Sequence, residues 1–235
     1  MSQIQLSKTQ PAVFSWSPDD LSVLQNLSKL SIGTIFQEIP KGREEATLKL
    51  LSDYDVYLLC GDPMMDLNEM HAALKRGKQG FSGVIFDIEP YGREEWKPDG
   101  DNSKILADFA EQVQRAYQYA KARDIEMLLC IPFWYDDTGY SDELELLVKN
   151  SDGICVMNYW RGKEWEHMEY EYELAGKYYK KLWSAYEFTK SDGKGILDQN
   201  TYAQNGINDA LENFKKHFGH TQISPAFHQQ DLRYF

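Results

Sequence analysis

The chain repeats one pattern from end to end, a short apolar run followed by an amphipathic stretch. Eight such units fit within the 235 residues, at about 30 residues each. Strands that alternate strictly with helices pair in parallel through right-handed crossovers. The sequence therefore predicts an α/β fold, a single (β/α)8 TIM barrel over residues 1–235, with residues 1–10 as a flexible N-terminal tail.

The apolar runs place the eight strands. The predicted strands are 12–16, 33–39, 57–60, the start of segment 81–90, 126–132, 154–157, 182–186 and 223–227. Among the helices, a first one opens at Ser17, and later ones are expected over 165–179 and 201–218. A doubly wound open sheet is the competing architecture, and it is less favoured because no glycine-rich phosphate loop follows the first strand.

Two acidic residues close the fourth predicted strand. Segment 81–90 reads FSGVIFDIEP, so Asp87 and Glu89 stand two residues apart. Side chains at i and i+2 of a strand point the same way, which puts both carboxylates on one face. Two carboxylates this close cannot both ionise freely at neutral pH, and a carboxyl kept partly protonated is the general acid that glycoside hydrolysis needs. The structural alternative is a pair that caps a loop or holds an arginine.

The active site of such a barrel lies at the C-terminal ends of its strands. The residues expected there are mainly aromatic and acidic. They are Trp16, Asp62, Asp87, Glu89, Tyr91, Trp134, Tyr135, Asn158, Tyr159, Arg161, Glu187 and His228. Sugars stack their C–H faces on aromatic rings and hydrogen-bond through their hydroxyls, so this mixture predicts a carbohydrate ligand. Trp134 and Tyr159 are the aromatic residues expected first in contact with it.

Two segments carry a resemblance to family 18 glycoside hydrolases, the chitinase-like barrels. Segment 82–89, SGVIFDIE, resembles a degenerate form of that family's D-G-x-D-x-D-x-E strand, and Met157-Asn158-Tyr159 is similar to its sixth-strand M-x-Y-D. The resemblance implies that Glu89 protonates the glycosidic oxygen, that Asp87 orients the substrate's own nucleophilic group, and that Tyr159 is a hydrogen-bonding partner in this step.

The chain departs from the family pattern at three positions. Ser82 and Ile85 stand where the family has its first two aspartates, and Trp160 stands where it has the aspartate after tyrosine. The loss of these charges puts the substrate-assisted mechanism in question. It also leaves open a barrel that binds a carbohydrate or a protein without turnover.

Glu187 supports a second comparison. Carboxylates after the fourth and seventh strands resemble the large clan of retaining (β/α)8 glycosidases, in which Glu89 would be the acid/base and Glu187 the nucleophile, roughly 5 to 5.5 Å apart. The structural alternative for Glu187 is an ion pair with Arg161 or a lysine. The D-x-E pair alone also resembles family 25 muramidases, which cleave peptidoglycan.

Other chemistries have less support in the sequence. The five histidines are scattered and the three cysteines form no C-x-x-C, so neither a metal nor a cofactor is expected, although His228 could join the rim carboxylates in a mixed site. The net charge of −12 argues against nucleic acids and anionic membranes as partners. The first ten residues hold no signal-peptide core, so the expected location is cytoplasmic, or extracellular if a leader has been removed.

Overall fold

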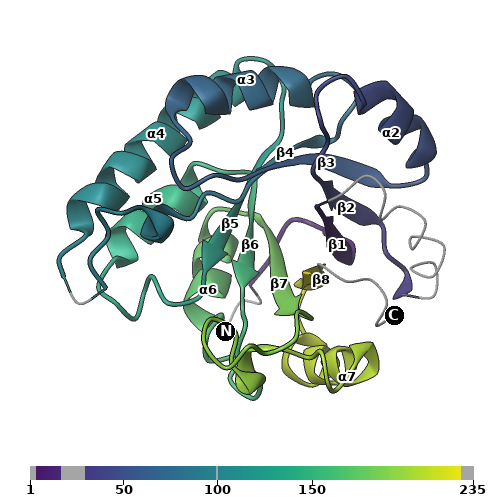
Figure 1. Ribbon diagram of the computed structural model, residues 1–235, viewed down its shortest axis with the longest axis vertical. Helices are drawn as coiled ribbons and strands as arrows, with labels where there is room; N and C mark the ends of the chain where they lie inside the picture. Colours follow the sequence, from purple (N-terminus) through teal and green to yellow (C-terminus); the bar gives the residue numbers. More distant parts are fainter. Residues whose placement is uncertain (1–3, 17–29, 99, 229–235) are drawn as a thin grey trace.

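Eight parallel strands close into one barrel in the computed structural model (Figure 1). The structure describes residues 4–16, 30–98 and 100–228. The strands are β1 (Ala12–Ser15), β2 (Thr34–Gln37), β3 (Asp55–Cys60), β4 (Gly83–Phe86), β5 (Met127–Pro132), β6 (Gly153–Met157), β7 (Lys181–Glu187) and β8 (Ser224–His228). They pair in chain order, and β8 returns to β1 through Ala12 opposite Ala226 and Val13 opposite Phe227. The closed ring confirms the predicted barrel and excludes the open doubly wound sheet.

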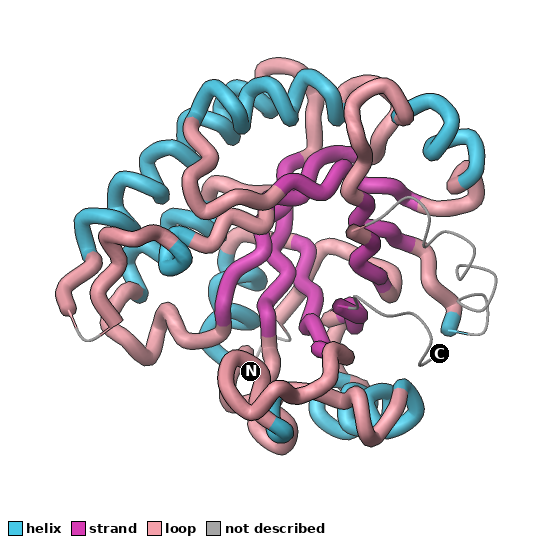
Figure 2. Tube along the Cα trace, viewed as in Figure 1, coloured by secondary structure: helices cyan, strands magenta, loops and turns pink. Residues whose placement is uncertain are grey.

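Six α-helices lie outside the ring of strands within the described residues (Figure 2). They are α2 (Glu44–Leu50), α3 (Leu67–Gly77), α4 (Ser103–Lys121), α5 (Ser141–Lys149), α6 (Glu169–Lys177) and α7 (Ile207–Phe218), with short 3-10 turns at Pro90–Gly92 and Asp198–Asn200. The helix predicted to open at Ser17 lies outside the described residues.

Two of the predicted helices are shorter than expected. The helix expected over 201–218 begins only at Ile207, because Gly206 before it has φ +83°, a left-handed conformation that interrupts an α-helix. The helix expected over 165–179 begins at Glu169, after Met168 with φ −128°. The residues before it form turns, in which His167 N–H donates to the carbonyl of Lys163.

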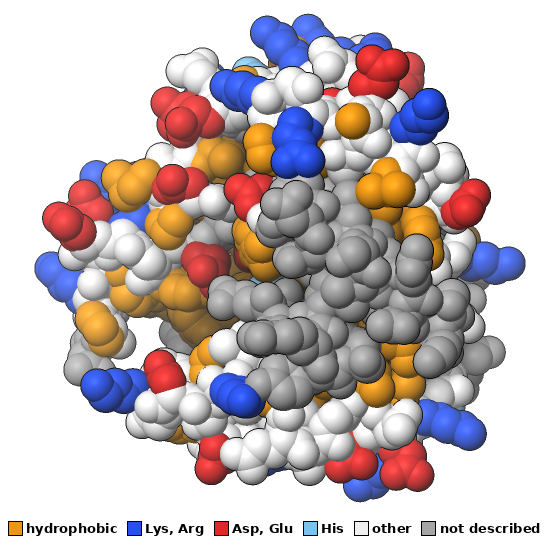
Figure 3. All heavy atoms as spheres, turned by 45° about the vertical axis from the view of Figure 1, so that its right-hand side comes forward, with side chains coloured by type: hydrophobic (Ala, Val, Ile, Leu, Met, Phe, Trp, Pro, Cys, Tyr) orange, Lys and Arg blue, Asp and Glu red, His pale blue; other side chains and the backbone are white. Residues whose placement is uncertain are grey.

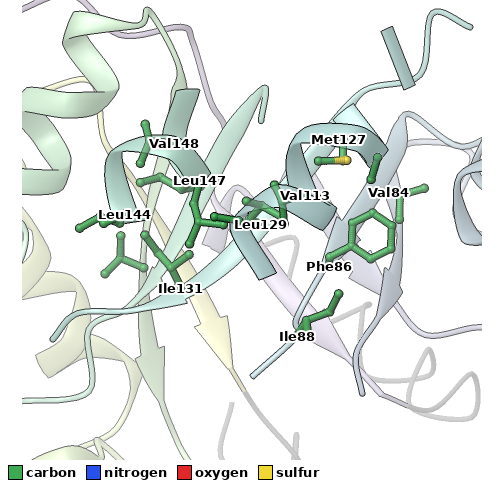
Figure 4. Packing of buried hydrophobic residues seen from close by; sticks show 14 of the residues in the cluster. Val84, Phe86, Ile88, Val113, Met127, Leu129, Ile131, Leu144, Leu147 and Val148 are labelled. Carbon is green, nitrogen blue, oxygen red and sulfur yellow. The ribbon is translucent and has the colours of Figure 1, made fainter. Parts of the chain in front are cut away.

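The strands alternate between two cores. Along β4 and the residue pair after it, Val84, Phe86 and Ile88 pack outward against the helices, together with Val113 of α4 (Figure 4). Ile85 points the other way, into the barrel interior. The interior is filled by a second cluster: Ala12, Phe14, Phe36, Tyr57, Leu59, Ile85, Leu128, Cys130, Cys155, Trp183, Ala185 and Ala226. The barrel is therefore packed below its mouth, as expected of an eight-stranded ring.

Residues 4–10, within the segment predicted as a tail, run along the N-terminal ends of the strands. Leu6 is buried, and its backbone N–H donates to Oε1 of Gln222 at 2.8 Å. The backbone N–H of Ser7 donates to the carbonyl of Lys180 at 3.0 Å. These contacts are at the opposite end of the barrel from the predicted site.

Candidate active site at the barrel mouth

Asp87 and Glu89 lie on the inner side of the chain where it leaves β4. The ladder continues one residue past the strand, since the backbone N–H of Asp87 donates to the carbonyl of Cys60 at 2.9 Å. Because Ile85 belongs to the interior cluster, the alternation of the strand carries Asp87 to the same side. Glu89 follows two residues later, and the charge of its carboxylate contributes to raising the pKa of Asp87.

Asp87 occupies a mostly apolar setting. Burial, with the Glu89 carboxylate adding to it, raises the pKa of Asp87 to about 6, while His228 and the thiol of Cys130 act in the opposite direction. Its Oδ1 atom is buried and has no hydrogen-bond partner among the described residues. Cys130 and Cys155, paired across β5 and β6, lie in the interior cluster with Ile85. Asp87 therefore lies at the mouth, above an apolar floor.

Glu89 is held by an aromatic neighbour two residues along the chain. The hydroxyl of Tyr91 donates to Oε1 of Glu89. Burial raises the pKa of Tyr91, and the charge of Glu89 adds to this, so the phenol keeps its proton and stays a donor. The ring of Tyr91 packs edge to face on Trp134, with centroids 5.3 Å apart, and Trp96 lies 6.0 Å from Trp134.

Trp96 was not predicted as a site residue. It stands in an irregular segment after the Pro90–Gly92 turn, and no strand end or periodic pattern marks it in the sequence. Its contacts with Tyr91 and Trp134 nevertheless make it part of the aromatic wall beside Glu89. Tyr135, which was predicted at the rim, is only 1% exposed and packs in the outer core.

Glu187 and His228 form a hydrogen-bonded pair across the ends of β7 and β8. Nδ1 of His228 lies 2.7 Å from Oε2 of Glu187. The other oxygen, Oε1, accepts the backbone N–H groups of Phe188 at 2.7 Å and Thr189 at 2.6 Å. Burial works against the charge of Glu187, but the hydrogen bonds and the nearby His228 outweigh it and lower its pKa. Among the described residues, His228 is thus a side-chain partner of Glu187, while Arg161 donates to Asn205.

The ring of His228 is fixed from several sides. Trp16 Nε1 donates to His228 Nε2 at 3.0 Å, and Tyr159 stacks on the imidazole with a centroid distance of 5.9 Å and an interplanar angle of 25°. Phe14 meets it edge on at 5.4 Å. Burial raises the pKa of Tyr159 well above its ordinary value, and the charges of Glu187 and Asp87 add to the shift. Tyr159 is therefore a neutral group between both sets of carboxylates.

Three of the residues predicted at the site make hydrogen bonds to loop residues. Asn158 is buried, and its Nδ2 donates to the carbonyl of Glu164 at 2.7 Å, which anchors the loop after β6. Arg161 donates to Oδ1 of Asn205 and lies over the ring of Tyr202 at 5.7 Å. Asp62 is exposed, and its Oδ1 accepts the backbone N–H of Met64 at 2.7 Å. These contacts stabilise loops.

The mouth therefore combines an acidic centre with aromatic walls. On one side the structure gathers Asp87, Glu89, Tyr91, Trp96 and Trp134, and on the other Trp16, Tyr159, Glu187 and His228. Figure 3 shows hydrophobic and acidic side chains bordering a hollow in this part of the surface. Within the described ranges, no three His, Cys, Asp or Glu side chains are grouped so as to hold a metal ion. In the same part of the chain, no helix has the length and apolar character to cross a membrane.

Solved structures with the same architecture include chitinases. A GH18 chitinase from Pseudoalteromonas aurantia superposes with a TM-score of 0.55 over 96% of this chain and 94% of its own, at 13% sequence identity. A chitinase from Chromobacterium violaceum gives a TM-score of 0.53 over 77% and 69%, at 12% identity. The fold is that of the family 18 chitinases.

Other chitinase-like barrels match to a similar degree. The catalytic domain 2 of an Ostrinia furnacalis group II chitinase, solved as a mutant with a chitin oligosaccharide, gives a TM-score of 0.53 over 83% of this chain and 70% of its own, at 14% identity. No protein-family model and no curated protein matches the sequence. The comparisons thus show that this chain shares its fold with the family 18 chitinases.

Proposed function

We propose that this protein is a glycoside hydrolase that cleaves a glycosidic bond in a glycan or glycoconjugate, with Glu89 as the general acid. The observation that carries the proposal is the pair Asp87 and Glu89 at the end of β4, in the segment that resembles the acidic strand of family 18 glycoside hydrolases. The aromatic wall of Tyr91, Trp96 and Trp134 beside Glu89 suits the apolar face of a sugar ring.

In the proposed reaction, Glu89 gives its proton to the glycosidic oxygen as the bond from that oxygen to the anomeric carbon breaks. The leaving sugar departs as an alcohol, and positive charge develops on the ring that remains. Water then adds to the anomeric carbon and returns a proton to Glu89. The Tyr91 hydroxyl orients the carboxyl for both transfers.

Asp87 is the group proposed to stabilise the developing charge. Its buried Oδ1 lacks a partner among the described residues, so it is free to accept a hydrogen bond from the substrate. Glu187 is less suited to attack the anomeric carbon, because both of its oxygens accept hydrogen bonds and it is only 4% exposed. The geometry therefore supports a substrate-assisted role for Asp87 and Tyr159 over a nucleophilic role for Glu187.

The test compares the wild-type protein with Glu89→Gln and, as a matched control, the exposed Glu95→Gln in the same connection. The substrates are chitin oligosaccharides, chosen for the solved neighbours, and peptidoglycan fragments. Removing a general acid should lower kcat by about 10²- to 10⁴-fold with little change in ligand affinity, while Glu95→Gln should retain full rate.

The outcome also decides between the enzyme and the binding alternative. Turnover that survives Glu89→Gln would contradict the assignment of the acid. Ligand binding without turnover in the wild type would favour a barrel that only recognises carbohydrate.

We also propose that the protein works in a reducing compartment. Cys60, Cys130 and Cys155 carry free thiols, which supports this proposal.

A further inference from the structure

The contacts of Glu187 leave one role open to it, that of orienting His228. A carboxylate that must attack carbon needs a free oxygen, whereas here Oε1 accepts two backbone N–H groups and Oε2 faces the imidazole. The same contacts keep Glu187 ionised. An ionised carboxylate beside Nδ1 accepts a hydrogen bond, so Nδ1 of His228 carries a proton.

The second ring nitrogen of His228 then has a defined state. Trp16 Nε1 is only a donor, and it donates to His228 Nε2 at 3.0 Å. Nε2 must therefore offer a lone pair, which it does in the neutral Nδ1–H tautomer and in no other form. The chain of bonds runs from Glu187 through His228 to the indole of Trp16, across the ends of β7, β8 and β1.

We propose that Glu187 and His228 are positioning residues that hold the indole of Trp16 at the mouth, and that protonation of His228 releases it. Protonation adds a hydrogen to Nε2, which then confronts the N–H of Trp16, and two donors cannot share that contact. The freed Nε2–H would face the mouth acids instead. Trp16 would thus line the site in the neutral form and leave it in the protonated form.

The surroundings of His228 raise the pKa of its imidazole above the ordinary value, and with it the pH at which this transition occurs. Burial lowers the pKa of the imidazole, but Glu187, with Asp87 and Glu89 from the segment after β4, outweighs it, so that the net shift is upward. Tyr159, which follows β6 and stacks on the ring, stays neutral, since its own pKa lies well above the ordinary value. The titratable neighbours of His228 in the described part of the chain thus favour its protonated form. The hydrogen bond from Trp16 favours the neutral form, because it needs the lone pair of Nε2.

Two substitutions test the two hydrogen bonds of His228 separately, the one with Glu187 and the one with Trp16. Glu187→Gln keeps the shape, but its amide oxygen must still accept from Phe188 and Thr189, so its NH₂ turns to His228. Nδ1 then becomes the acceptor and the ring proton moves to Nε2, which removes the bond to Trp16. Trp16→Phe deletes the donor and leaves the tautomer unchanged, because Glu187 still accepts from Nδ1–H.

Nitrogen-15 NMR of the full chain reads the tautomer directly. At a pH above the titration of His228, the wild type and Trp16→Phe should show an unprotonated Nε2 in His228, and Glu187→Gln should show an unprotonated Nδ1. The indole N–H resonance of Trp16, assigned by its loss in Trp16→Phe, should shift in step with the titration of His228. An Nδ1–H tautomer retained in Glu187→Gln, or an indole resonance that ignores that titration, would overturn the inference.

A second experiment measures KM, and it rests on the proposed function because it needs turnover of a glycan. Loss of the Trp16 hydrogen bond should raise KM by about two- to tenfold, and Glu187→Gln should add nothing further in a Trp16→Phe background. Additive effects on KM would refute the shared path. If the wild type shows no turnover at all, the hydrolase proposal fails while the tautomer experiment still decides the inference.

Discussion

Tyr91 donates its phenolic hydrogen to the carboxylate of Glu89, two residues before it in the chain. Proline occupies the position between them and begins the 3-10 turn that brings the phenol back over the acid. The aromatic wall and the proposed proton donor are therefore one local unit, fixed by the first residues after β4.

Tyr91→Phe should distinguish the contribution of the Tyr91 hydroxyl from that of its ring. The phenylalanine keeps the edge-to-face contacts with Trp96 and Trp134 but leaves Glu89 without this donor. We expect kcat on a hydrolysed glycan to fall by roughly tenfold, the value of one hydrogen bond to a charged group, with little change in stability. Tyr140→Phe is the control, because Tyr140 contacts Trp96 in the same cluster. Equal losses in both variants would contradict a specific role for the Tyr91 hydroxyl.

Asp87→Asn should stabilise the protein above pH 6. The pKa of Asp87 is raised from its ordinary 3.8 to about 6, so ionisation costs folding free energy that grows between these two values and is constant above the higher one. The shift corresponds to at most about 3 kcal/mol. Urea unfolding at pH 8 should show this gain, and at pH 3.5 the gain should vanish. The exposed Asp108→Asn on α4 should be neutral at both pH values, and a pH-independent effect of Asp87→Asn would refute the explanation.

Glu171→Met should also stabilise the fold at high pH. Glu171 in α6 is fully buried, and neither carboxylate oxygen has a hydrogen-bond partner among the described residues. Burial raises the pKa of Glu171 well above 4.5, so the wild type should lose stability relative to the variant as the pH rises past this value. We expect a gain of about 1–3 kcal/mol at pH 8 in thermal or urea unfolding. The exposed Glu169→Met in the same helix serves as the control, and a destabilised Glu171→Met would argue for an undetected partner.

Gly83→Ala should destabilise the start of β4. A Cβ at Gly83 would lie 2.4 Å from the backbone carbonyl oxygen of Glu126, and the N–H of Val84 donates to that same oxygen. Backbone of the neighbouring segment has to move, so we expect a loss of about 1–3 kcal/mol in urea unfolding. Gly195→Ala, whose Cβ would come no closer than 3.8 Å to Asp192, should change stability by less than about 0.5 kcal/mol. Comparable losses in the two variants would count against the steric argument.

The sequence predicted the barrel because its strands alternate so regularly. Along segment 84–89 the period of two separates the outward Val84, Phe86 and Ile88 from the inward Ile85, and this alternation carries Asp87 inward as expected. Helix starts were harder to predict. The apolar pattern of 201–218 continues through Gly206, whose positive φ shows only in the folded backbone.

The partners of the site residues could not be predicted from the sequence. Glu187 and His228 are 41 residues apart, and their contact depends on the register of β7 with β8, which places them opposite each other. Local pattern reports which side chains reach a strand end. It does not report which neighbour they contact. Asn158 and Arg161 were assigned to the ligand, whereas in the structure Asn158 donates to the loop after β6 and Arg161 donates to Asn205 in the connection after β7.

Of the eight strand pairings in the described barrel, the one between β1 and β8 has the fewest paired residues. Two residue pairs are in register there among the described residues, against three to five at the other joints. The indole of Trp16 and the imidazole of His228 meet directly above this joint. Among the strands, amide hydrogen exchange should therefore be fastest along β1 and β8. A molecule that bridges Trp16 and His228 should slow this exchange, because it would stabilise the closure of the barrel.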